Sequence, residues 1–157
     1  MASARSPRVV AAALLGVVAL LAGCASPATT TVTSCIDWVG FDTPADAAED
    51  ADAVIIGEVG EQSGSTTYYE MPAAMWEVSV DAWVKGGDGS SEIVVTSLPR
   101  SCGDTRDSVA DAVDAGPVVL FLRDGDQGWE TLTPFQGIVA TGVDGAVPVE
   151  WPTDLYD

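Results

Sequence analysis

Apolar and polar residues alternate along several short segments of this chain, which is the pattern of strands that bury one face. The clearest is the segment 76–84, whose core-facing positions are predicted to be Trp76, Val78, Val80, Ala82 and Val84. The residues between them, including Trp83, are predicted to face solvent. Apolar runs of similar length predict further strands at 53–59, 93–97, 118–122 and 129–133, and a terminal pair at 138–141 and 147–150.

Two short helices are predicted among these strands. Thr43 precedes Pro44 and stands three residues before Asp46, a capping-box-like start with proline at the first helical position. The helix is predicted to end near Asp52. The segment 105–115 predicts a second helix, whose apolar face would be formed by Val109, Ala112 and Val113.

The order of the elements predicts the fold class. The polar stretch 60–72 is interpreted as a long hairpin loop, and 124–128 as a tight hairpin turn. Five or more short strands with a helix between the third and the fourth is the order of an OB-like barrel. We therefore expect a mainly β protein, a small OB-like five-stranded barrel with one or two short helices. Periodicity alone does not distinguish it from a small sandwich.

The first residues have the pattern of a bacterial lipoprotein signal peptide. Arg5 and Arg8 precede the apolar run 9–22, which is shorter than the roughly 20 residues of a spanning helix. The run ends in Leu21-Ala22-Gly23-Cys24, the order of a lipobox, in which the cysteine thiol receives a diacylglyceryl group. The alternative is an ordinary cleavage site followed by a chance cysteine.

The lipobox predicts three parts: a signal peptide at 1–23, the lipidated Cys24 with a flexible tether at 24–34, and one domain at 35–157. Two or more acyl chains hold a protein stably on a bilayer, so the predicted location is the extracytoplasmic face of the cell membrane. The near absence of Lys and Asn suggests a GC-rich, actinobacterium-like source.

Two cysteines, Cys35 and Cys102, remain once Cys24 is acylated. In an oxidising compartment they allow a single intramolecular disulfide. Closing a loop of about 67 residues would stabilise the fold by roughly 4 kcal/mol in the chain-entropy model. Two free thiols and a metal site are the alternatives, and two lone cysteines without His or a CxxC motif are poor metal ligands.

Charge and composition restrict the possible functions. The 24 acidic and six basic residues give a net charge of −18, which argues against nucleic acid as a partner. The chain has no His and a single Lys, so a nucleophilic Ser has no obvious activating base. We therefore expect no catalytic activity and no cofactor. Asp124-x-Asp126 resembles the start of an EF-hand loop, but Trp129 stands where glycine is required, and a plain hairpin turn is the alternative.

Aromatic residues at predicted exposed positions are the candidate partner-binding residues. Trp83 lies between Asp81 and Lys85, and Tyr68 and Tyr69 lie in the predicted long loop. Trp and Tyr are favoured at binding hot spots. The alternative is that Trp83 covers the end of the barrel or packs under a helix.

In order and spacing, several segments resemble the netrin-like domain, the group that includes the tissue inhibitors of metalloproteinases. The residues that carry the resemblance are Cys35, Ala51-Asp52-Ala53-Val54, Lys85-Gly86 and Cys102-Gly103. The resemblance covers about 35–137 and implies an OB-like barrel. It also implies a Cys35–Cys102 bridge, because the family pairs the matching cysteines.

This chain departs from the inhibitors at its start. They chelate a protease zinc through the free amine of an N-terminal cysteine, whereas Cys35 is preceded by ten spacer residues and Cys24. The Cys-x-Cys start is also missing. The sequence therefore predicts a non-catalytic interaction or ligand-binding module, held to the bilayer through Cys24, whose partner is an unknown envelope protein or small ligand. A loop-mediated inhibitor of an extracytoplasmic protease and a solute- or Ca²⁺-binding lipoprotein are the alternatives.

Overall fold

The computed structural model describes residues 35–153 and 155. The described residues belong to one compact unit. The predicted signal peptide, Cys24 and the tether lie outside the described residues. Within the described part, no helix has the length and apolar character needed to span a membrane.

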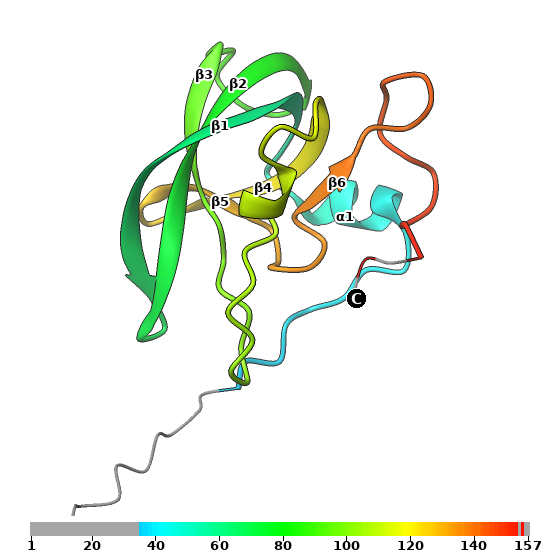
Figure 1. Ribbon diagram of the computed structural model, residues 1–157. Coiled ribbons are helices and arrows are strands. Elements are labelled where there is room, and N and C mark those ends of the chain that lie inside the picture. Colours follow the sequence, from blue (N-terminus) through cyan, green and yellow to red (C-terminus); the bar gives the residue numbers. More distant parts are fainter. Residues whose placement is uncertain (1–34, 154, 156–157) are drawn as a thin grey trace, which may run out of the picture. The chain divides into compact units, whose positions relative to one another are not determined.

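The described chain is mainly β, as predicted. It has one short α-helix and one 3-10 turn besides its strands, and Figure 1 labels the strands and the helix. In chain order the elements are α1 (Pro44–Asp50), β1 (Ala53–Tyr68), β2 (Met71–Lys85), β3 (Glu92–Thr96), η1 (Ala110–Ala112), β4 (Val118–Gly125), β5 (Gly128–Thr131) and β6 (Ile138–Ala140).

The strands form one sheet that curls into a partial ring. Its order is β1-β2-β3-β5-β4-β6, and β1 also pairs with β4. All pairings are antiparallel except β3 with β5, which consists of the two register pairs Val95–Trp129 and Thr96–Glu130. The fold is therefore barrel-like, short of a closed barrel, and the OB-like prediction is confirmed in strand order. The short β6 pairs with β4 and lies outside this ring of five strands.

The predicted long loop at 60–72 is wrong. β1 continues to Tyr68 and β2 starts at Met71, so only Tyr69 and Glu70 form the turn. Both turn residues have positive φ, as a two-residue hairpin of the favoured mirror-image type requires. The hairpin extends as an arm past the neighbouring strands (Figure 1). A strand that is solvated over most of its surface needs no alternation of apolar and polar residues. The polar half of β1 therefore carries no strand pattern in the sequence.

The predicted orientation of the end of β2 is also wrong. β1 and β2 shift register twice in this region. One shift lies just before the pair Ile55–Trp83, and the other just after the pair Ile56–Ala82. A bulge places an extra residue on one strand and so reverses the alternation beyond it. As a result Trp83 packs against the inner core, whereas Val84 is 52% exposed.

Two apolar cores lie on opposite faces of the sheet. The inner core includes Ile55, Val78, Leu120 and the turn residue Ala112. The outer core joins α1 to the outward faces of β1 and β4, and its members are Ala47, Ala51, Val54, Val119, Phe121, Leu132 and Val139. Because β4 contributes to both cores, its run VVLFL is apolar at every position and buried throughout, as predicted.

The predicted start of α1 is confirmed. The amide of Asp46 donates to the Thr43 hydroxyl at 3.2 Å, and the Asp46 carboxylate accepts from the Thr43 amide at 2.9 Å. The helix ends at Asp50, two residues earlier than predicted. The Lys85 ammonium donates to the backbone carbonyls of Ala48, Glu49 and Ala51 and so caps its C-terminal end.

The other predicted helix and the last predicted strand are largely absent. The segment 105–115 holds only the turn η1, where the Asp107 carboxylate accepts from the amides of Val109 and Ala110. The same carboxylate accepts from Trp76 and Ser97, which fixes the turn at one end of the inner core. Residues 147–150 form no strand, whereas 138–140 pairs with β4.

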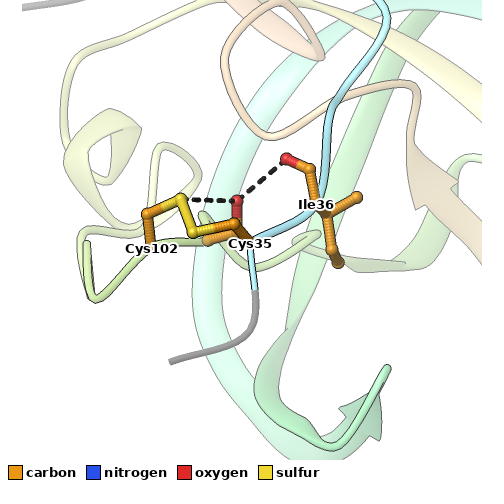
Figure 2. Close-up of a disulfide and its surroundings, with 4 residues drawn as sticks. Cys35, Ile36 and Cys102 are labelled. Carbon is orange, nitrogen blue, oxygen red and sulfur yellow. Dashed lines mark hydrogen bonds between the residues drawn. A yellow bond between two sulfur atoms is a disulfide. The ribbon is translucent and has the colours of Figure 1, made fainter. Parts of the chain in front are cut away.

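The predicted disulfide is present between Cys35 and Cys102, with the Cα atoms 4.6 Å apart (Figure 2). Next to it, the Ser101 hydroxyl donates to the backbone carbonyl of Ile36 at 3.0 Å. The start of the domain is thereby fixed to the loop that follows β3.

Candidate functional site

A pocket of about 280 Å³ opens between the ends of two hairpins. The β1–β2 hairpin contributes Tyr68, and the β4–β5 hairpin contributes the other lining residues, which are Arg123, Gly125, Asp126, Gln127 and Glu130. The two hairpin ends are tied together because the Thr66 hydroxyl donates to the side-chain oxygen of Gln127 and the Tyr68 hydroxyl donates to Glu130. We call this site the hairpin pocket.

Glu130 is the unusual residue of the hairpin pocket, a carboxylate only 6% exposed on a strand. Its Oε1 accepts from the Tyr68 hydroxyl at 3.2 Å, and its Oε2 has no hydrogen-bond partner among the described residues. Gly125 makes room for it, since a Cβ there would lie 2.7 Å from Oε2. Burial raises the pKa of Glu130, although the hydrogen bond from Tyr68 opposes the shift. The pocket therefore holds an acceptor that is largely withdrawn from bulk water.

Tyr68 stands at the centre of a small aromatic group. Tyr69 meets its ring edge-on at a centroid distance of 4.7 Å, and Trp38 lies tilted at 6.4 Å. Burial and the neighbouring Glu130 carboxylate raise the pKa of the Tyr68 hydroxyl to about 12. This hydroxyl therefore stays protonated at neutral pH and acts as a fixed donor to Glu130.

Arg123 is the basic residue that lines the hairpin pocket, and its ion pair is long. Of the four basic residues in the described part, Lys85 caps α1, and Arg100 and Arg106 bond to Asp104. The hydrogen bonds from Arg106 hold the pKa of Asp104 well below its usual range. Arg123 faces Glu130 across the β4–β5 pair and reaches an ion-pair partner, Asp50, only at 4.0 Å. Its guanidinium retains donors for a ligand.

The structure brings together two of the three predicted partner-binding residues. Tyr68 and Tyr69 lie in contact at the hairpin tip, and Tyr69 is 63% exposed. Trp83 does not line the hairpin pocket. It packs against the inner core with its ring 5.9 Å from that of Trp129, and its indole N–H donates to the carbonyl of Ser90. Trp83 therefore packs against the core instead of facing solvent as predicted.

Sequence reasoning missed Arg123, Gln127 and Glu130. Glu130 lies in the predicted strand 129–133, and no local sequence pattern marks a buried carboxylate. Among residues 35–153 and 155, no group of three or more acidic, His or Cys side chains is arranged to hold a metal ion. Asp124 lies in β4 and Asp126 in the turn that leads to β5, so this segment forms a hairpin, as predicted for 124–128.

Comparison with known proteins gives no match to a family model, to a curated protein or to a solved structure.

Replacing Glu130 by Gln should leave the domain at least as stable as the wild type at pH 7. The raised pKa means that the native state binds the Glu130 proton more tightly than the unfolded chain does. Its contribution is thus most favourable below the ordinary pKa of 4.5 and is lost as pH rises through the raised value. Gln keeps the acceptor for Tyr68 without the charge.

The measurement is the melting temperature of both proteins from pH 4 to pH 8. The difference should grow with pH in favour of Glu130→Gln. The matched control is Glu77→Gln, an exposed acid on β2, for which no such trend is expected. A variant less stable than wild type at pH 7 would show that the Glu130 charge supports the fold.

Proposed function

We propose that this protein is a membrane-anchored cell-surface lipoprotein whose barrel-like domain acts as a non-catalytic ligand-binding or interaction module. The observation that carries the proposal is the hairpin pocket. In OB-folds, ligands are bound by the face of strands 2 and 3 together with the loops that join strands 1 and 2 and strands 4 and 5. Here those two hairpin ends, at Tyr69 and at Asp126-Gln127, meet around one pocket.

The chemistry of the pocket supports binding more than catalysis. Tyr68, with a pKa of about 12, is a poor base or nucleophile at neutral pH. Glu130 is held by Tyr68 beside a glycine, which suits a fixed acceptor. No nucleophile with an adjacent base lines this pocket, whose residues are Tyr68, Arg123, Gly125, Asp126, Gln127 and Glu130.

The proposed anchor rests on the sequence. Cleavage before Cys24 would leave four basic and 24 acidic residues, a net charge of −20. Such a body is repelled by anionic headgroups, and the ten-residue segment 25–34 reaches about 33 Å when extended. The domain is thereby expected to stand clear of the bilayer, with the hairpin pocket accessible to envelope components.

Replacing Cys24 by Ala should release the protein from the membrane. Without the thiol no diacylglyceryl group is attached, and the domain itself offers the bilayer no compensating basic surface. The measurement is incorporation of an alkyne-tagged fatty acid, together with membrane fractionation, for wild type and variant. The variant should carry no label and leave the membrane fraction. Wild-type protein without label would refute the lipoprotein assignment.

The binding role is tested in intact cells with a photo-crosslinking residue at position 69, next to the hairpin pocket. The matched control carries it at position 88, an exposed site in the turn after the other end of β2. A defined adduct from position 69 that is absent from position 88, and lost in the Cys24→Ala background, supports the proposal. Equal labelling at both positions, or none, contradicts it. A protease as the adduct would instead indicate the inhibitor alternative.

A further inference from the structure

We infer that the hairpin pocket binds an uncharged saccharide, with sugar hydroxyls held by Glu130, Arg123 and Gln127 and a ring face stacked on Tyr68. The inference rests on the proposed binding function and names its ligand class. It depends on three features of the pocket: how its donors and acceptors are arranged, what its aromatic group offers, and which charges it disfavours.

Donors and acceptors alternate around the pocket. Arg123 pairs with Glu130 in the β4–β5 register and both residues line the pocket, so its wall holds a guanidinium donor and the unpartnered Oε2 acceptor. Asp126 and Gln127 are neighbours in the turn, and the Thr66 hydroxyl occupies the oxygen of Gln127, which leaves its amide N–H₂ as a donor. A hydroxyl group both donates and accepts, so paired planar side chains of this kind match adjacent hydroxyls.

The aromatic group supplies the apolar part of the site. Tyr68 lines the pocket, and its ring is supported by Tyr69 and Trp38. An aromatic ring offers an apolar face beside its polar hydroxyl, and the C–H face of a sugar ring is an apolar surface of similar size. A ligand made only of polar groups would leave this surface unused.

Charge disfavours both anions and cations as ligands. The acidic surface repels anions from a domain with four basic residues. A cation that reached Glu130 would also meet Arg123, its cross-strand neighbour. A zwitterion could place its carboxylate on Arg123 and its ammonium on Glu130, and alanine is therefore included among the probes. An uncharged polyhydroxyl ligand satisfies both kinds of group without a net charge.

The test is a titration of the full chain in a detergent without a sugar headgroup, followed by tryptophan fluorescence and calorimetry. The probes are the neutral trisaccharides maltotriose, cellotriose, xylotriose, mannotriose and chitotriose, up to about 10 mM because single-site sugar binding can be as weak as millimolar. Tri-galacturonate, alanine and spermidine represent anions, zwitterions and cations. We expect saturation by at least one neutral trisaccharide and by none of the charged probes.

Variants connect the binding to the pocket. Glu130→Gln should weaken the affinity about tenfold, because it removes a charged acceptor. Tyr68→Ala should abolish saturation, whereas Tyr68→Phe keeps the ring and should retain it. Glu77→Gln, the exposed control on β2, should bind as wild type. Melting curves identify any variant that fails to fold. If Tyr68→Ala does not fold, the single variants Tyr68→Phe and Glu130→Gln test the inference.

The outcomes separate this inference from the proposed function. Affinity that rises from monosaccharide to trisaccharide identifies a glycan chain as the ligand, and equal affinity identifies a free sugar. If no neutral saccharide saturates the protein, or a charged probe binds more tightly, the saccharide inference fails. It also fails if Glu130→Gln and Tyr68→Ala bind as wild type. If saccharides do not bind but the position-69 adduct still forms, the proposed binding function holds and only the saccharide inference fails. If the adduct is also absent, the proposed function and the saccharide inference both fail.

Discussion

Replacing Cys35 and Cys102 together by serine is expected to lower the free energy of unfolding by about 4 kcal/mol, through the loop of 67 residues that the bond closes. For a domain of this length that corresponds to a fall of about 15 °C in melting temperature. The effect is large because the bond restrains the unfolded chain between Cys35 and the loop after β3. Without it, this segment is still held by the hydrogen bond from Ser101 to Ile36 and by the ring contact of Trp38 with Tyr68.

The measurement is thermal and urea unfolding of the double serine variant and of the wild type, with and without a reductant. Reduced wild type should match the variant, and the variant should be insensitive to reductant. Ser101→Ala, which removes the neighbouring hydrogen bond and keeps the disulfide, is the matched control and should lose far less. A fall of less than about 3 °C in the double variant would mean that the unfolded chain is already restrained across this loop.

The elements that the sequence predicted well are those with strong local signals. The capping box fixed the start of α1, and the apolar run of β4 marked a strand buried on both faces. The errors arose where tertiary pairing overrides the local pattern. The polar half of β1 is a strand because β2 pairs with it, and the bulges beside Trp83 reverse an alternation that reads as regular.

The hairpin pocket could be predicted only in part. The two tyrosines were identified because exposed aromatics are notable in any sequence. Glu130 was not, since its burial depends on Tyr68, which lies 62 residues away, and on the absence of a side chain at Gly125. A site assembled from two hairpin ends has no motif, because the residues that complete each contact lie in different parts of the chain.

Replacing Phe121 by Ala is expected to destabilise the domain by about 3–5 kcal/mol, the range for a fully buried aromatic side chain. Phe121 stands in the outer core between β4 and α1, and its ring meets that of Trp151 at 5.6 Å. The Trp151 indole in turn donates to the carbonyl of Phe41, whose amide and carbonyl are also held by the side chain of Gln136.

The loss at Phe121 should therefore spread to the helix and to both ends of the domain. The measurement is urea unfolding with hydrogen exchange, in which α1 and the segments around Phe41 and Trp151 should lose protection before β2 does. Val84→Ala, which shortens an exposed side chain on β2, is the control and should change stability by less than about 0.5 kcal/mol. Uniform loss of protection would instead show that the outer core and the barrel unfold as one unit.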